Sequence, residues 1–392
     1  VKMDYLRPGS QNYPAKVDYT YDALGRPATK KDYFNTPTPD LVHTYTYNDR
    51  SEVISDSLGS GRSYSYHYDN MGNRTTSLEH GNMVIYVTNP LNQYTSVRPH
   101  VIINSIPDAA PASLPGEFFP EYDADGNQTL VKTATGIWTV AYNAQNQATA
   151  FTKDTKRIEC VYDYLNRRVE KTVYDGDTLV SRKRFIYLGY LQVAELDATN
   201  ETETASPILR KTYLWDPVES VATRILAMSV FDEAGVYQED LYYTHDLLKN
   251  TTALFGIQGG RRALYEYSPY GDIIKMEGNA AEINPFRFSS EYLDDDLGLV
   301  YYNYRYYNVV DGRWINRDPM AENAGFNLYC FVSNKLSIDY LGYKDIDKSY
   351  IQRGGTLITR KADGQVTVNM VPLGAIVSTR VRGVNTPQND EK

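Results

Sequence analysis

The chain has 392 residues and a formal net charge of −9, with 42% hydrophobic and 23% charged residues. This length is enough for one large core or for two to three ordinary domains. The acidic balance argues against a nucleic-acid or anionic-membrane partner for the body of the chain, and no apolar run is long enough to span a membrane.

The N-terminus, the cysteines and the histidines bear on targeting and on metal binding. The N-terminus lacks the charged and apolar segments of a signal peptide, and a first residue other than Met indicates a fragment of a longer protein. Cys160 and Cys330 fit two separate thiols of a reducing compartment, with one disulfide left open. The five histidines show no ligand spacing, so we expect neither a metal site nor a cofactor.

A tyrosine repeat runs through the first half of the chain, which has 36 Tyr against 11 Phe and 3 Trp. The repeat is Y-x-Y-[DN]-x-x-[GNR]. It reads YTYDALGRP at 19–27, YTYNDRSEV at 45–53, YHYDNMGNR at 66–74, EYDADGNQT at 121–129, AYNAQNQAT at 141–149 and VYDYLNRRV at 161–169. Such self-similarity indicates one repeat architecture rather than several unrelated domains.

Each repeat has the chemistry of a strand, a turn and a returning strand. The two tyrosines of Y-x-Y point to the same face of a sheet because side chains alternate along a strand. Asp or Asn then opens a turn by binding the backbone that follows it, and Gly supplies the positive φ that the turn needs. Such hairpins bury their apolar faces by stacking on one another, so the sequence predicts an all-β fold built as a long ribbon.

Helical periodicity is almost absent, and three segments interrupt the repeat. They are predicted to be loops: TPTPD at 36–40, a proline-rich insertion near 99–120, and DATNETETASP near 197–208. We expect them to leave the ribbon at the edge of the sheet.

The second half of the chain carries the most specific pattern. It reads YYTHDLLKNTTALFGIQGGRRALYEYSPYGD at 242–272 and FRFSSEYLDDDLGLVYYNYRYYNVVDGRWINRDP at 286–319. This pattern is similar to the RHS-associated core, and the tyrosine repeats resemble the YD repeats of the same family. The RHS family includes bacterial polymorphic toxins, insecticidal toxin-complex C subunits and wall-associated proteins.

The resemblance implies a β-hairpin ribbon that spirals into a hollow, cocoon-like shell around a variable C-terminal segment. The expected organisation is a YD-repeat shell at 1–285, an RHS-associated core and plug at 286–342, and a variable tail at 343–392. About 340 residues are few for a closed container, so part of a shell or a reduced shell is expected. The family also implies a secreted or cell-surface location, with the chain's own C-terminal segment and an immunity or secretion-apparatus protein as partners.

Two aspartates near the C-terminus match the family's intramolecular aspartyl protease. Asp318 stands in RDPMA, where Ala321 replaces the family's Gly, and Asp339 stands in IDYLG, where Tyr340 replaces Pro. The resemblance implies that one carboxyl acts as acid and the other as base, and that the chain is cut in the region of Leu341, Gly342 and Tyr343. The residues that match the family's plug motif are Pro319, Gly325, Asn327 and Tyr329.

Two interpretations of these aspartates stay open. In the first they are catalytic, with Arg305, Arg313 and Arg317 tuning the charge of Asp318. In the second the aspartates cap turns that seal the shell, while the arginines form ordinary ion pairs or stack on tyrosine rings. The segment between the two aspartates is slightly shorter than in the family pattern, which favours the second interpretation.

The function itself also has two candidates. The tail at 343–392 contains no His and no Cys, and short strands are predicted at TLITR, QVTVNMV and AIVSTRV, so a non-enzymatic tail is expected. The first candidate is a scaffold that encloses and presents this tail. The second is a secreted or cell-surface module whose tyrosines bind carbohydrate. Inward-facing tyrosines would favour enclosure, and exposed tyrosines would favour binding.

Overall fold

The computed structural model of the chain is all-β, as the repeat predicts. It describes residues 2–5, 15–34, 36–79, 81–100, 116–202, 204–217, 224–323, 325–340, 342, 344–346, 355–360 and 366–371. The predicted loop at 99–120 therefore lies mostly outside the described residues, while 36–40 and 197–208 connect strands as expected.

The ribbon consists of two antiparallel sheets in which the strands follow one another in sequence order. The first sheet contains β1 (Lys2–Tyr5), β2 (Ala15–Tyr21), β3 (Pro27–Tyr33), β4 (Leu41–Tyr47), β5 (Val53–Leu58), β6 (Ser63–Tyr68), β7 (Arg74–Glu79), β8 (Asn82–Thr88) and β9 (Tyr94–Pro99). The second contains β10 (Glu121–Tyr122), β11 (Gln128–Thr133), β12 (Gly136–Tyr142), β13 (Ala148–Lys153), β14 (Lys156–Tyr162), β15 (Arg168–Asp175), β16 (Thr178–Leu188), β17 (Leu191–Asp197), β18 (Ile208–Trp215), β19 (Ile225–Phe231), β20 (Tyr237–His245), β21 (Thr251–Gly256), β22 (Arg261–Tyr267) and β23 (Ile273–Glu277).

The remaining elements are short. They are η1 (Phe288–Ser290), β24 (Tyr292–Asp294), β25 (Leu299–Tyr302), β26 (Arg305–Asn308), β27 (Arg313–Trp314), η2 (Ala321–Asn323), η3 (Val332–Asn334), β28 (Ile338–Tyr340), β29 (Lys344–Ile346), β30 (Gly355–Arg360) and β31 (Val366–Val371). Strands β24 to β27 form one sheet, and the pairs β28–β29 and β30–β31 form two hairpins. The tail strand predicted at AIVSTRV lies outside the described residues.

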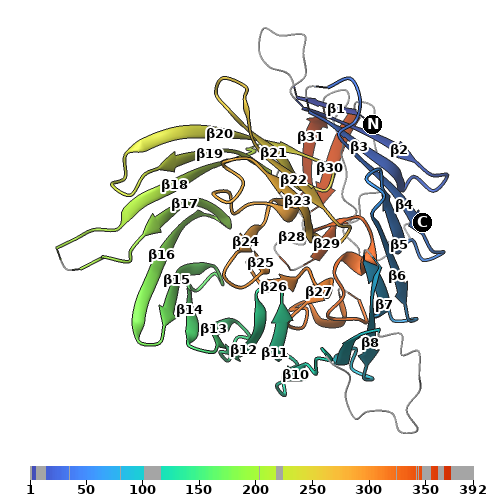
Figure 1. The fold of residues 1–392 in the computed structure, drawn as a ribbon, viewed down its shortest axis with the longest axis horizontal. Coiled ribbons are helices and arrows are strands. Elements are labelled where there is room, and N and C mark those ends of the chain that lie inside the picture. Colours follow the sequence, from blue (N-terminus) through green and yellow to red (C-terminus); the bar gives the residue numbers. More distant parts are fainter. Residues whose placement is uncertain are drawn as a thin grey trace, which may run out of the picture.

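The two large sheets form an open arch around the short elements (Figure 1). A backbone bridge between Val97 and Phe118 joins the end of the first sheet to the segment before the second. In Figure 1 strands β1 to β8 lie on one side and β11 to β20 on the other, with β24 to β28 between them. The arch is not a closed container.

The turn of each repeat is held by its Asp or Asn side chain, as predicted. The Oδ1 atom of Asp69 accepts the backbone N–H groups of Met71 (2.8 Å) and Asn73 (2.9 Å), and Gly72 between them has a φ of +80°. The same pair of bonds is made by Asp22, Asn48, Asn89, Asp123, Asn143, Asp163, Asp232 and Asp246.

The last tyrosine of a repeat ties that repeat to the one before it. The Tyr142 hydroxyl donates to the backbone carbonyl of Gln128 (2.9 Å), and the Tyr162 hydroxyl donates to Ala148 (2.8 Å). Each acceptor is the first residue of a returning strand and lies opposite a β-bulge, where the regular ladder is interrupted. Equivalent bonds run from Tyr47 to Pro27, Tyr68 to Val53, Tyr187 to Arg168 and Tyr267 to Thr251.

The concave side of the arch is filled by the segment from Phe286 to Ile338. Its aromatic side chains pack with those of the ribbon into one large core, which includes Trp138, Phe151, Tyr302, Tyr307, Trp314 and Phe331. A buried ion pair also joins the two, because Asp294 of β24 binds Arg168 of β15 at 2.7 Å and contacts Lys171. The described part of the interior is therefore packed, where the family resemblance implies a hollow.

The first strands of the ribbon pack against the last ones. Lys30 of β3 lies 3.2 Å from Asp246, which follows β20, and His43 of β4 lies 3.5 Å from Glu266 of β22. An apolar cluster beside them joins the two sheets through Ala15, Phe34, Leu41, Ala253, Phe255 and Leu264. The arch is thus held at this seam by side chains.

The tyrosine links give a first prediction. Tyr142→Phe keeps the ring but leaves the Gln128 carbonyl without its donor, so the free energy of unfolding should fall by about 1 kcal/mol. Urea denaturation measures the change. Tyr164→Phe is the matched control because Tyr164 is a repeat tyrosine that is 88% exposed in a turn. Equal stability of the two variants would contradict the assigned role of the hydroxyl.

A second prediction concerns acid stability. Glu195 of β17 lies 3.2 Å from Lys183 and 3.3 Å from Lys211 on the two neighbouring strands. Burial opposes its ionisation, but the two lysines outweigh burial and lower the pKa of Glu195 to about 2. Stability from such a group is present above its unfolded pKa, about 4.3, and is lost as the pH falls through the folded pKa.

We therefore expect the wild type to lose on the order of 3 kcal/mol more than Glu195→Gln when the pH falls from about 5 to about 2. Unfolding curves recorded across this range measure the two slopes. Glu233→Gln, at an exposed turn position, should keep the wild-type slope. Parallel slopes for wild type and Glu195→Gln would show that the two lysines do not stabilise the ionised carboxyl.

Candidate functional site

The candidate site is organised by Arg305, the first residue of β26. Its side chain is almost fully buried, and its guanidinium lies 3.9 Å from the ring centre of Trp314 on β27. The alternation of the β25–β26 hairpin explains this position, because neighbouring tyrosines on the same strands fill the core on either side. The stacking on Trp314 fixes the plane of the guanidinium.

The Arg305 guanidinium brings the two predicted aspartates together. Its Nη1 lies 2.9 Å from Oδ2 of Asp318, and its Nη2 donates to Oδ2 of Asp339 at 3.1 Å. Asp339 stands on β28 and is 1% exposed, while Asp318 lies in the loop after β27. The two aspartates are 21 positions apart in sequence, and each contacts a different nitrogen of the same guanidinium.

The third edge of the guanidinium binds the backbone of the predicted cleavage region. Arg305 Nε donates to the carbonyl oxygen of Gly342 at 2.6 Å. Gly342 joins β28 to β29 with a φ of +69°, and a Cβ atom there would lie 2.8 Å from Cβ of Tyr302. Both the backbone angle and the close packing require glycine at this position. Leu341 and Tyr343, the other two residues of the predicted cleavage region, lie outside the described residues.

Burial sets the electrostatics of the site. It raises the pKa of the Asp318 carboxyl above its usual value, although Arg305 and the N–H of Met320 oppose the shift. Burial and the nearby charge of Asp339 together raise the pKa of Glu291 well above its usual value. Carboxyls with raised pKa values can hold a proton at neutral pH and act as acids.

Arg305 is one of the three arginines that the sequence analysis places near Asp318, whereas Glu291 was not predicted as a site residue. The signal for Arg305 is the strand YYNYRYYN at 301–308, where a single charge stands among aromatic and amide residues. A charge there needs a buried partner, but the sequence does not say which one. Glu291 carries no comparable signal, because its proximity to Asp339 arises from the tertiary packing of segments that are 48 positions apart in sequence.

The plug motif holds the C-terminal segment to the repeat turns. The Tyr329 hydroxyl donates to the Gly126 carbonyl at 2.7 Å, and the Asn327 amide donates to the Oδ1 atom of Asn73 at 2.8 Å. Pro319 and Gly325 are exposed. Tyr329 is buried and Asn327 is half-buried, and the two residues bind turns of three different repeats, one of them through Gln93.

The other two arginines predicted to tune Asp318, Arg313 and Arg317, lie elsewhere. The Arg313 guanidinium stacks over Tyr94 at 3.9 Å and donates to the Asn92 carbonyl at 2.6 Å. Arg317 is exposed, and its side chain passes over Gly126. The cation beside Asp318 is thus Arg305, while Arg313 stacks on tyrosine as the second interpretation of the arginines expects.

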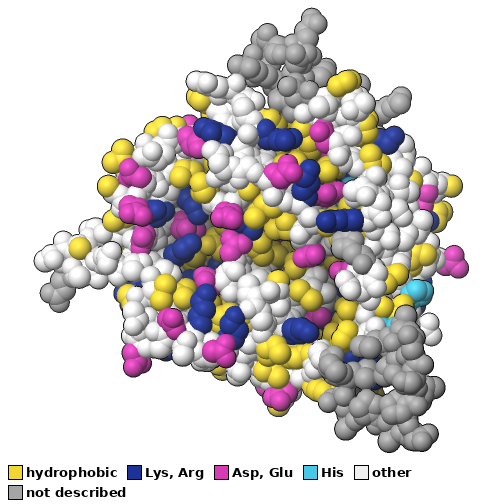
Figure 2. Space-filling view, in the orientation of Figure 1, with side chains coloured by type: hydrophobic (Ala, Val, Ile, Leu, Met, Phe, Trp, Pro, Cys, Tyr) yellow, Lys and Arg dark blue, Asp and Glu magenta, His cyan; other side chains and the backbone are white. Residues whose placement is uncertain are grey.

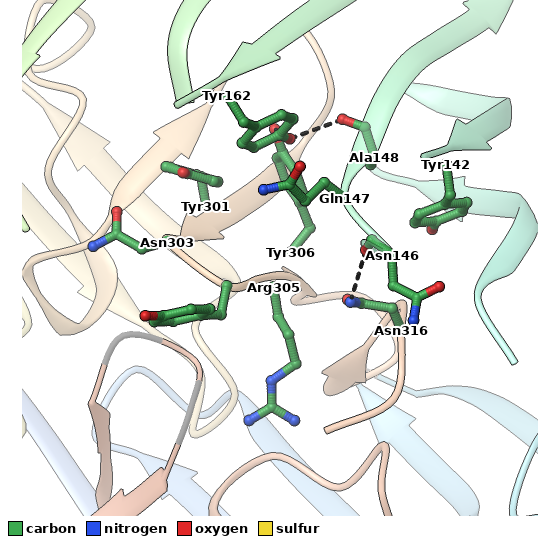
Figure 3. A pocket seen from close by; sticks show the side chains of 11 residues that line it. Tyr142, Asn146, Gln147, Ala148, Tyr162, Tyr301, Asn303, Arg305, Tyr306 and Asn316 are labelled. Carbon is green, nitrogen blue, oxygen red and sulfur yellow. Dashed lines mark hydrogen bonds between the residues drawn. The ribbon is translucent and has the colours of Figure 1, made fainter. Parts of the chain in front are cut away.

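A small pocket lies behind Arg305 (Figure 3). It has a cavity of about 10 Å³ and is lined by Tyr142, Asn146, Gln147, Tyr162, Tyr301, Asn303, Tyr306 and Asn316, among others. The Arg305 side chain runs away from these tyrosines in Figure 3. The cavity is far smaller than a usual small-molecule site, which has about 300 Å³ or more.

Within the described ranges, no group of three or more His, Cys, Asp or Glu side chains is arranged to hold a metal ion. Cys160 and Cys330 are not joined by a disulfide, and no helix in the described part of the chain is long and apolar enough to cross a membrane.

Comparison with known sequences gives relatives that are much longer than this chain. No family model matches it. The double-stranded DNA deaminase toxin A of Burkholderia cenocepacia is 28% identical over 232 residues, which are 55% of this chain and 16% of the toxin. The toxin subunit YenC1 of Yersinia entomophaga is 26% identical over 289 residues, 69% of this chain and 28% of the subunit. The tRNA3(Ser)-specific nuclease WapA of Bacillus spizizenii is 25% identical over 319 residues, 76% of this chain and 12% of the nuclease.

Comparison with solved structures establishes the fold. The Photorhabdus luminescens Tc holotoxin pore matches 86% of this chain with a TM-score of 0.66 and 20% identity, and this match covers 17% of the pore chain. The TcdB2–TccC3 complex without its hypervariable C-terminal region matches 86% of this chain with a TM-score of 0.64 and 19% identity, again over 17% of that chain. The tyrosine repeat, the ribbon around its own core segment and these likenesses show that the chain has the fold of the RHS/YD-repeat shell proteins.

Proposed function

We propose that the chain is part of a toxin-associated shell, which encloses and presents its own C-terminal segment and releases it by cutting the bond after Gly342. In this proposal residues 1–285 form the shell wall, 286–342 form the core and plug, and 343–392 are the released tail. One observation carries the proposal: Arg305 gathers Asp318, Asp339 and the Gly342 carbonyl around one buried guanidinium.

The chemistry is amide hydrolysis inside the protein. The Asp339 carboxylate takes a proton from a water molecule, whose oxygen adds to the carbonyl carbon of Gly342. Protonated Asp318 then gives its proton to the leaving nitrogen of Tyr343, and the C–N bond breaks. The products are a new carboxylate at Gly342 and a new amine at the start of the tail. The two aspartates need opposite protonation states, and the raised pKa of Asp318 suits it to the role of acid.

The enclosing role is supported by the direction of the tyrosines. Tyr66, Tyr265 and Tyr302 are buried, and the hydroxyls at the ends of the repeats bind the ribbon's own carbonyls. Figure 2 shows a hollow in this face of the molecule with hydrophobic side chains at its floor and charged side chains around it. Such a surface suits a segment of the chain's own backbone more than a polar ligand.

The competing function is carbohydrate binding by the tyrosines. A second pocket lies at the seam between the two sheets, and Tyr19, Tyr45 and Tyr267 are among its lining residues. Its cavity of about 30 Å³ has room for water but not for a sugar, and Tyr19 and Tyr267 are themselves buried in packing. We therefore favour enclosure.

The relatives also suggest a location and partners for the protein. Because these relatives are named as toxins and toxin subunits, we propose a secreted or cell-surface location and an immunity or secretion-apparatus protein as partner. The deaminase and nuclease activities belong to those proteins, and no enzymatic activity is proposed for residues 343–392.

The proposal predicts a cut that depends on Asp318. The purified wild-type chain should give a separate fragment consisting of residues 343–392, and Asp318→Asn should remain whole because it has no acid for the leaving nitrogen. Intact-mass spectrometry measures both. Asp311→Asn is the matched control, since Asp311 is a buried aspartate of the same inner segment outside the site. A wild-type chain of full mass would leave the aspartates as structural residues that seal the shell.

The raised pKa of Asp318 predicts the pH dependence of the cut. An acid with a raised pKa stays protonated to higher pH, and its activity is lost as the pH rises through that pKa. Chain refolded from denaturant should therefore be cut faster in mildly acidic than in mildly alkaline buffer, as followed by mass over time. A rate that rises steadily with pH would instead assign the acid role to a different group.

A further inference from the structure

A lysine and two carboxyls are buried together at the seam between the two large sheets. Lys30 and Asp32 stand two positions apart on β3, so their side chains point to the same face, and Asp246 stands in the turn between β20 and β21. Lys30 Nζ lies 3.2 Å from Oδ2 of Asp246 and 3.3 Å from Oδ2 of Asp32. Lys30 is 6% exposed, Asp32 0% and Asp246 2%. An amine and a carboxyl are thus held in contact away from bulk water.

Asp32 is the unusual member of this group. Apart from the contact with Lys30, neither of its buried carboxyl oxygens has a hydrogen-bond partner. A buried carboxylate without hydrogen bonds is costly in free energy, so the surroundings favour the protonated form. Burial raises the pKa of Asp32, against the opposing charges of Lys30 and His43. Asp32 can therefore hold a proton beside the amine and exchange it.

From this geometry we propose that the chain joins Lys30 to Asp246 by an isopeptide bond as it folds, with Asp32 relaying the protons. Protonated Asp32 gives its proton to Oδ2 of Asp246 and takes one from the Lys30 ammonium, which frees the amine to add to the carboxyl carbon. A second proton moves from the nitrogen to Oδ2 by the same route, and Oδ2 leaves as water. An ammonium and a carboxylate become an amide and water, so atoms and charge balance without a further reactant.

The turn prepares Asp246 for this attack. Its Oδ1 accepts the backbone N–H groups of Leu248 (2.8 Å) and Asn250 (3.0 Å), and its Oδ2 accepts the Asn250 amide at 2.9 Å. When the amine adds, the two backbone donors stabilise the negative charge that forms on Oδ1. They also keep Oδ1 in place as the oxygen of the new amide, so Oδ2 is the oxygen that departs.

The departing water has a space beside the reacting atoms. The seam pocket of about 30 Å³ has room for water, and Lys30, Asp246 and Asn250 are among its lining residues. The rings of Tyr19 and Tyr267 line the same pocket. Because the fold already holds the amine against the carboxyl, the reaction avoids the entropy cost of bringing two molecules together.

A second buried lysine shows what the seam site has in addition. Lys171 contacts Asp294 and donates to Asp296 at 2.8 Å, and Arg168 binds Asp294 as well. Burial opposes the ionisation of both aspartates, but these cations, together with Lys156 at Asp296, outweigh burial and lower both pKa values. No protonated carboxyl is therefore present beside Lys171, and we expect it to remain an ion-pair lysine.

The bond closes the arch covalently. Lys30 belongs to the first sheet, Asp246 joins two strands of the second, and 216 positions separate them in sequence. A cross-link between such distant positions restricts the unfolded chain and keeps the two ends of the ribbon together when other seam contacts break.

The experiment is intact-mass measurement and peptide mapping of the folded full chain. We expect the wild-type protein to be lighter than its sequence by the mass of one water, and its digest to contain Lys30 and Asp246 in one branched peptide. Recovery of the two residues in separate peptides, with no branched peptide, would overturn the proposal. The result does not depend on the proposed cut, because both residues lie before Gly342.

Three variants assign the roles. Lys30→Arg keeps the positive charge but has no amine to form the amide, so its mass should match its sequence. Asp32→Asn keeps both reacting groups but lacks the acid, so after refolding from denaturant the branched peptide should form about 100-fold more slowly or less. Lys171→Arg is the matched control, since Lys171 is also buried and contacts two aspartates, and it should lose water as the wild type does.

The variants can also contradict the proposal. Loss of water that persists in Lys30→Arg would assign that loss to other residues and overturn the bond. A branched peptide that forms in Asp32→Asn at the wild-type rate would overturn the proton relay by Asp32. If a variant does not fold, the peptide map of the wild-type chain still decides whether the bond exists.

Discussion

The fold depends on one hydrogen bond that is repeated along the ribbon, from a tyrosine hydroxyl to the first carbonyl of the preceding repeat's returning strand. The bulge opposite that carbonyl interrupts the ladder, and the hydroxyl supplies the missing donor. Phenylalanine could pack in the same place but could not donate. The bond explains why this chain uses tyrosine so heavily and why each hairpin keeps a fixed position relative to the last.

The ribbon also needs its own inner segment. A curved sheet exposes an apolar concave face, and residues 286–338 cover it with aromatic packing and with the buried pair of Asp294 and Arg168. Breaking one partner of such a buried pair leaves an uncompensated charge, so the inner segment and the wall stabilise each other. The plug contacts of Asn327 and Tyr329 extend this coupling to the turns of the first sheet.

The candidate site lies where these layers meet. Strand β26 carries Arg305 as part of the packed inner sheet, and the loop and hairpin that follow bring the two aspartates and Gly342 to it. The candidate site and the packed inner segment are therefore parts of one packing arrangement.

The sequence by itself determined the repeat, the Asp and Asn turns and the all-β ribbon, because those follow from contacts between residues that are close along the chain. It also indicated Asp318 and Asp339 as a pair and Tyr329 as a plug residue. Only the tertiary structure decided that Arg305, rather than Arg313 or Arg317, lies between the two aspartates, and that the interior is packed. Those features depend on which strands, distant in sequence, pack against one another in the interior. Local periodicity carries no information about that packing.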